Sequence, residues 1–124
     1  MAPEIREGRV YDGIQVDLFS LGVIVYQIVQ GTSPFSAATK DDLYYSQLVS
    51  RQTNTFFELL NAQHLSAEFK DLVSRLLAYD ASRRLSIDEL RSHPWLCQKI
   101  VIIDIQAPSK KFKSNSKNFV IKGE

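Results

Sequence analysis

A run of fourteen residues, VDLFSLGVIVYQIV (16–29), most constrains what this chain can fold into. Its apolar residues do not share one face of a helix, and a helix that is apolar on every side is normally surrounded by protein. The run is shorter than the ~20 residues that a membrane-spanning helix needs, and it contains Asp17 and Gln27. No cationic stretch precedes it, as one would in a secretory signal peptide. We therefore expect a central helix packed by protein all round, and no membrane span.

Capping and breaker residues predict the elements that follow. Gly31 ends the central helix in a turn. Thr39 and Asp42 place a capping side chain and an acid at the start of a helix over about residues 40–50. A short helical segment is expected over residues 56–60.

The clearest helical periodicity begins at Ser66. Apolar residues recur after it at i, i+3, i+4, i+7 and i+8, which predicts an amphipathic helix with one buried stripe: Phe69, Leu72, Val73, Leu76 and Leu77. Ser86 and Glu89 have the spacing of a capping box at the start of the next helix. That helix must end before His93-Pro94, because a residue that precedes proline is pushed out of the helical region. The fold class is therefore mainly α, without paired strands.

The end of the chain has a different composition. IVIIDI (100–105) is a β-prone run, and residues 107–124 contain five lysines and one acid, Glu124. We expect a C-terminal extension over 99–124 with a disordered basic tail from about residue 107. Binding of the tail to an acidic partner stays open. The whole chain has a net charge of +1, which gives no signal for nucleic-acid binding.

Five short motifs occur in a fixed order over residues 2–95. They are Ala2-Pro3-Glu4, Asp17-Leu18-Phe19-Ser20-Leu21-Gly22, Gly31-x-x-Pro34-Phe35, Asp80-x-x-x-Arg84 and His93-Pro94-Trp95. Together they resemble the C-terminal lobe of a eukaryotic protein kinase domain, in the serine/threonine branch and nearest to the calmodulin-dependent group. The resemblance begins at the A-P-E motif, which follows the activation loop in that family. It implies a truncated kinase-like helical lobe over residues 1–98, and we expect a kinase sequence cut at an internal methionine, Met1.

The motifs that carry phosphoryl transfer in that family have no counterpart in this sequence. It contains no G-x-G-x-x-G, no H-R-D and no D-F-G. The resemblance implies ATP and Mg²⁺ for a complete kinase domain, and we expect neither to bind this chain alone. His64, His93 and Cys97 lack the spacing of metal ligands, so we expect no metal site and no catalytic residue. The interpretation is the C-terminal part of a serine/threonine kinase domain, inactive as an isolated chain. The alternative is a non-catalytic, kinase-like binding or scaffold module.

The resemblance implies structural roles for the motif residues that remain. Glu4 would form an ion pair with Arg84, and Gly22 would permit close packing on the central helix. Asp17 binds the catalytic loop in the family; with that loop absent, its remaining role would be at the N-terminus of the central helix. Gln27 stands where kinases directed to basic substrates often carry a glutamate, which argues against strong arginine-directed specificity. The other reading of Gln27 is a polar residue at the helix rim.

The expected partners are protein substrates or the missing half of the kinase domain, and not nucleic acid. Without that half, part of the face of the central helix that bears Phe19, Val23 and Tyr26 should be left exposed. Cys97 is the single cysteine, which suits a reducing compartment and a cytoplasmic location.

Overall fold

The computed structural model describes residues 1–98, and the β-prone run and basic tail lie outside the described residues. Every regular element within residues 1–98 is a helix, which confirms the mainly α fold class. In chain order the elements are α1 (Pro3–Arg6), α2 (Gly13–Gln30), α3 (Tyr45–Val49), α4 (Thr53–Leu59), α5 (Ala67–Leu76), the short 3-10 helix η1 (Ala81–Arg83) and α6 (Ile87–Arg91).

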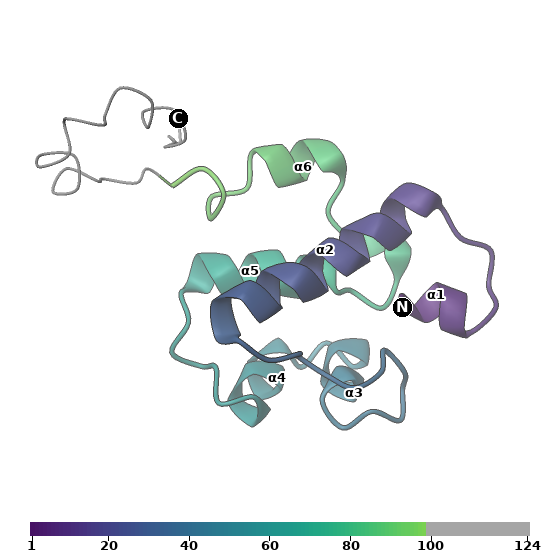
Figure 1. Ribbon diagram of the computed structural model, residues 1–124, viewed down its shortest axis with the longest axis horizontal. Coiled ribbons are helices and arrows are strands. Elements are labelled where there is room, and N and C mark those ends of the chain that lie inside the picture. The colour runs from purple at the N-terminus through teal and green to yellow at the C-terminus, as the bar shows by residue number, and fades with distance from the viewer. Residues whose placement is uncertain (99–124) are drawn as a thin grey trace, which may run out of the picture.

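The long helix α2 is the centre of the arrangement. It runs alongside α5, with α3 and α4 on one side of the pair and α6 on the other (Figure 1). Phe19 of α2 lies in an aromatic cluster, with ring centroids 6.1 Å from Phe35 and 6.0 Å from Tyr45. The hydroxyl of Tyr45 donates to the carbonyl of Leu77 at 2.8 Å, so this cluster also ties α3 to the end of α5.

The burial of α2 differs from the expectation in two ways. The helix is not packed all round, because Ile24 is 50% exposed and Ile28 is 76% exposed. The prediction that part of the face bearing Phe19, Val23 and Tyr26 is exposed is wrong, because Phe19 and Tyr26 are buried in the core and Val23 is half-buried. A helix that is apolar on every side gives no sequence signal for which face its neighbours cover. In the described residues, α5 and the α3–α4 pair lie against one side only.

By length and composition alone, α2 is long and apolar enough to cross a membrane. The core helix of a water-soluble protein passes the same test. Here α2 buries Leu18, Phe19, Gly22 and Tyr26 against the rest of the lobe. That the chain does not span a membrane stays a prediction.

The start of α2 lies before the predicted position. Asp12 is its N-cap and accepts the backbone N–H of Ile14 at 2.8 Å. The expectation that Asp17 serves at the N-terminus of this helix is therefore wrong, because Asp17 lies one turn inside it. Gly31 ends α2 as predicted, in the left-handed conformation with φ of 82°.

The helix predicted over residues 40–50 is shorter than expected, because Asp42 caps it from a turn. Its carboxylate accepts the backbone N–H groups of Ser36, Ala37, Tyr44 and Tyr45 at 2.9–3.1 Å. Burial would raise the pKa of Asp42, but these four hydrogen bonds hold it below its usual value. The chain therefore turns at residues 40–44, and α3 begins only at Tyr45.

The second half of the lobe follows the sequence closely. Ser66 caps α5 by accepting the backbone N–H of Phe69 at 3.1 Å, and the predicted apolar stripe is buried throughout. Ser86 and Glu89 form the capping box of α6, with hydrogen bonds of 2.9 and 3.1 Å. α6 ends at Arg91, before the His-Pro pair.

Candidate functional site

The most buried polar contact of the lobe is an ion pair between α1 and the residue that follows η1. Arg84 donates from Nη1 to Oε2 of Glu4 and from Nη2 to Oε1 of Glu4, each at 2.7 Å. The two side chains are only 0% and 2% exposed. Ala2 and Pro3, which precede Glu4, are also buried, and proline at the first helical position suits the start of α1. The structure thus contains the pair that the kinase resemblance implied.

Further contacts of Arg84 join the pair to the core. Its Nε donates to the carbonyl of Ala78 and its Nη1 to the carbonyl of Gln15, both at 2.9 Å. Its guanidinium carbon lies 5.0 Å from the ring centroid of Phe19. The hydrogen bond from Arg84 holds the pKa of Glu4 below its usual range, against the opposing effect of burial. One arginine therefore fixes α1, the first turn of α2 and the chain after α5 relative to one another.

Gly22 marks the closest approach of α2 to α5. A Cβ atom built on Gly22 would lie 2.8 Å from Cβ of Leu76 and 2.9 Å from Cδ2 of Leu77. Real Cβ atoms do not approach other atoms so closely, so only glycine fits here without a shift of one helix. The close packing expected of Gly22 is thus present in the structure.

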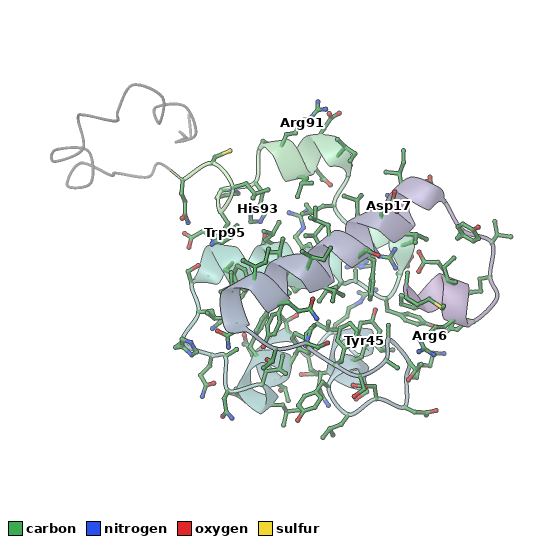
Figure 2. The ribbon with its side chains drawn as sticks, in the orientation of Figure 1. Arg6, Asp17, Tyr45, Arg91, His93 and Trp95 are labelled. Atoms are coloured by element: carbon green, nitrogen blue, oxygen red, sulfur yellow. The ribbon has the colours of Figure 1, made fainter. Side chains whose placement is uncertain are left out.

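Asp17 and Gln27 lie away from the Glu4–Arg84 pair, on the exposed side of α2. Figure 2 shows Asp17 near the start of the helix. Their offset of ten positions corresponds to about 15 Å along the helix axis. The exposed side of α2 also contains Ile24 and Ile28, so it combines polar and apolar side chains.

His93 has a structural role that the sequence indicated only in part. Its ring is buried, with Nε2 at 2.7 Å from Oδ2 of Asp71, and its Nδ1 accepts the backbone N–H of Trp95 at 3.1 Å. Since Nδ1 accepts a hydrogen bond, Nε2 carries the proton that is donated to Asp71. Figure 2 shows His93 beside Trp95, whose ring packs on Phe69 of α5 at 5.1 Å between centroids. The His-Pro-Trp motif indicated where His93 lies at the end of the last helix, but no local sequence signal identified Asp71 as its hydrogen-bond partner.

Comparison with known proteins identifies the family of this lobe. A family model described as a protein kinase domain matches residues 1–96. The chain belongs to the protein kinase family.

Its relatives place it in the serine/threonine branch. The chain is 39% identical over 95 residues to the human SNF-related serine/threonine-protein kinase, over 77% of this chain and 12% of that kinase. It is 38% identical over 94 residues to the rice serine/threonine protein kinase OSK3, over 76% of this chain and 17% of that kinase. The chain is therefore part of a serine/threonine protein kinase domain, and it spans less than a fifth of the length of these curated relatives.

Solved kinase structures have the same fold. The crystal structure of the Rad53 kinase domain and SCD2 in complex with AMPPNP matches with a TM-score of 0.59 and 30% identity, over 82% of this chain and 39% of that one. A second crystal structure of the Rad53 kinase domain and SCD2 matches with a TM-score of 0.58 and 25% identity, over 90% of this chain and 44% of that one. The similarity covers most of the described lobe.

Side chains that could bind a metal ion do not cluster within residues 1–98. No three His, Cys, Asp or Glu side chains within residues 1–98 lie close enough together to hold a metal ion. The carboxylate of Asp80 is committed to Ser82, accepting its backbone N–H at 3.0 Å and its hydroxyl at 2.7 Å. The buried polar groups of the lobe are arranged to hold helices together.

Proposed function

We propose that this chain forms part of the C-terminal lobe of a kinase that, as a complete protein, transfers phosphate from ATP to serine or threonine of protein substrates. We further propose that the 124-residue chain alone does not catalyse this reaction. The family match over residues 1–96 carries the first statement. The second is supported by the absence from the sequence of the phosphate-binding, base and Mg²⁺-binding motifs of the family.

The exposed face of α2 is our candidate for the surface that receives the rest of the catalytic domain. Ile24 and Ile28 on this face are half or more exposed, and Asp17 lies exposed about two turns before Ile24 and three before Ile28. Exposed apolar side chains gathered on one helix face favour a protein partner. A carboxylate at one end supplies an acceptor for backbone N–H groups of that partner. The kinase resemblance gives Asp17 this role toward the catalytic loop.

A melting experiment with Mg²⁺–ATP tests the inactivity of the isolated chain. A ligand at about 100 times its Kd adds ~2.7 kcal/mol to the free energy of unfolding, which in a domain of this size raises the Tm by roughly 10 °C. We expect no change in the Tm of the chain and no transfer of phosphate to a serine-containing peptide. A clear rise in Tm with Mg²⁺–ATP would contradict the proposal.

A non-catalytic binding module is the second candidate function. The observation that favours it is the same exposed pair, Ile24 and Ile28, because an apolar helix face can serve a partner other than a catalytic half. Either function places the protein in the cytoplasm by our proposal, since Cys97 is an exposed free thiol that suits a reducing compartment. For either, we propose protein partners and no nucleic acid.

A further inference from the structure

A groove of about 980 Å³ lies between the end of α3, the C-terminal part of α5 and the segments that follow α1 and η1. Its charged lining is unbalanced. Of the nine basic residues within 1–98, four line the groove: Arg9, Arg51, Arg75 and Arg83. Of the twelve acidic residues within 1–98, only Asp80 lines it. The groove is therefore locally basic in a lobe whose described part has more acidic than basic residues.

Two of the four guanidinium groups are available for a ligand. Arg51 and Arg83 are exposed and form no ion pair with any residue in the described part of the chain. Arg75 has only loose partners, with nitrogens 3.7 Å from Asp71 and 3.6 Å from Glu89. Loose, exposed pairs of this kind exchange readily with a competing anion.

Arg9 and Asp80 limit the positive charge of the groove without removing it. Arg9 lies 2.7 Å from Glu7, whose carboxylate also accepts the hydroxyl of Tyr79 on the groove wall. One oxygen of Asp80 accepts two hydrogen bonds from Ser82, and these bonds, with the weaker attraction of the Arg83 and Arg51 charges, lower the pKa of Asp80. The net charge presented to a ligand thus comes mainly from Arg51 and Arg83.

The backbone at Arg51 points to a use for its side chain. At the end of α3, the backbone N–H of Gln52 donates to the carbonyl of Gln47, and the backbone N–H of Arg51 donates to the carbonyl of Leu48. This pattern places Arg51 at the left-handed position after the helix, with φ of 62°. α1 and α4 end in the same hydrogen-bond pattern, with Gly8 and Asn61 in that position. Glycine and asparagine tolerate this conformation, whereas arginine does not favour it. A strained residue at the rim of a groove suggests that its side chain is needed there.

We propose that this groove binds a phosphorylated segment of a partner protein, with Arg51 and Arg83 paired to the phosphate. A phosphoserine or phosphothreonine carries nearly two negative charges at neutral pH, which two free guanidinium groups match. The planar fork of arginine binds phosphate oxygens in pairs, and no lysine lines the groove. The volume leaves room for residues on either side of the phosphate. A long nucleic acid fits poorly, because the acidic remainder of the described lobe would repel its backbone.

Fluorescence anisotropy with the full 124-residue chain tests this proposal. The probe is a fluorescein-labelled peptide of glycine and alanine with one central phosphoserine, compared with the same peptide carrying serine. We expect the phosphopeptide to bind at least about tenfold more tightly, and the double variant Arg51→Gln/Arg83→Gln to lose at least about tenfold in affinity. Arg91→Gln is the matched control, because Arg91 is 77% exposed on α6 and points away from the helices (Figure 2). It should change the affinity by less than about twofold.

Arg51→Gly separates binding from stability. Glycine relieves the left-handed backbone, so this variant should melt at a higher temperature than the parent while binding the phosphopeptide more weakly. Arg83→Gln alone serves if the double variant does not fold, with the fluorescence of Trp95 as the readout of folding.

Four results would overturn the proposal. They are equal loss of affinity in Arg91→Gln, full binding by Arg51→Gly, binding of inorganic phosphate as tight as that of the peptide, and tighter binding of a thymidine oligonucleotide that depends on Arg51 and Arg83. None of these measurements involves kinase activity, so the outcome is independent of the proposed function.

Discussion

Removal of either partner of the Glu4–Arg84 pair should be severe for the stability of the lobe. Glu4→Ala deletes two hydrogen bonds of 2.7 Å to a charged group, each worth ~1.5–3 kcal/mol, and leaves a guanidinium that is 0% exposed without its carboxylate. Breaking a buried pair in this way costs about 3–5 kcal/mol. A domain is stable by only ~5–15 kcal/mol, so the variant should lose about a fifth or more of the free energy of unfolding.

The double variant distinguishes a direct pair from two separate effects. Arg84→Met keeps an apolar stem near Phe19 and should cost about as much as Glu4→Ala, because it leaves the Glu4 carboxylate buried and unpaired. In Glu4→Ala/Arg84→Met no charge remains stranded, so its free energy of unfolding should be close to that of either single variant. The coupling energy should then equal the cost of one single variant, about 3–5 kcal/mol. Urea unfolding followed by circular dichroism and by the fluorescence of the single tryptophan, Trp95, measures all four proteins.

An exposed pair of similar geometry provides the control. Arg9 and Glu7 also approach to 2.7 Å, but their side chains are 43% and 31% exposed. Arg9→Met should therefore cost at most ~1 kcal/mol. If the effects of Glu4→Ala and Arg84→Met simply add, or if Arg9→Met is as costly as either, the reasoning from burial is refuted.

Four further predictions follow from particular contacts. The pKa of Glu4 is lowered in the folded protein, so the stability that this carboxylate contributes is present above its unfolded pKa of about 4.5 and is lost as the pH falls through its folded pKa. The difference in Tm between the parent and Glu4→Gln should therefore shrink from pH 7 toward pH 3. A constant difference would contradict this. Gly22→Ala should cost ~1–3 kcal/mol in urea unfolding, because its Cβ would overpack against Leu76 and Leu77. A Cβ at Gly13 on the same helix has no neighbour within 4 Å, so Gly13→Ala should cost nothing. Equal effects would exclude the close approach of α2 and α5. Ser86→Ala should cost ~0.5–2 kcal/mol because it removes the N-cap of α6, whereas Ser20→Ala on the exposed side of α2 should be neutral or slightly stabilising in the same assay. The exposed apolar pair of α2 should make the isolated chain self-associate, and Ile24→Lys/Ile28→Lys should reduce this association in sedimentation experiments without lowering the Tm. Unchanged association would show that another surface is responsible.

Much of the lobe was predictable because its signals are local. Ser66 and Ser86 lie at helix starts and form side-chain caps that a few neighbouring residues determine. The apolar residues of α5 recur at helical spacing, so its buried face could be predicted from the sequence. The Glu4–Arg84 ion pair could be predicted only from the kinase resemblance, because its partners are 80 positions apart in the sequence.

The errors fall where the sequence carried no directional information. The run from Val16 to Val29 is apolar on all sides, so periodicity could not show that Ile24 and Ile28 face outward. Asp12 and Asp17 are both good residues for a helix start, and only the structure shows that the first is the cap. Asp42 was placed inside a helix, but a carboxylate with four backbone N–H donors is more stable as the cap of a turn.

The basic groove was beyond the reach of sequence reasoning for a different reason. Arg9, Arg51, Arg75 and Arg83 are spread over most of the described chain, and no motif connects them. They meet only because α3 and α5 end at the same place. The left-handed backbone at Arg51 is likewise invisible without the structure.

We propose that this chain supplies the helical lobe of a kinase whose catalytic motifs lie on another segment. The most direct test measures transfer of radiolabelled phosphate from ATP to a serine-containing peptide, first with the chain alone and then with the segment that precedes A-P-E in a related serine/threonine kinase, produced in the same cells. We expect no transfer by the chain alone, transfer by the pair, and strong loss of transfer with Asp17→Asn but not with the exposed control Asp41→Asn. Transfer by the chain alone, or a folded pair that binds Mg²⁺–ATP and stays inactive, would contradict the account.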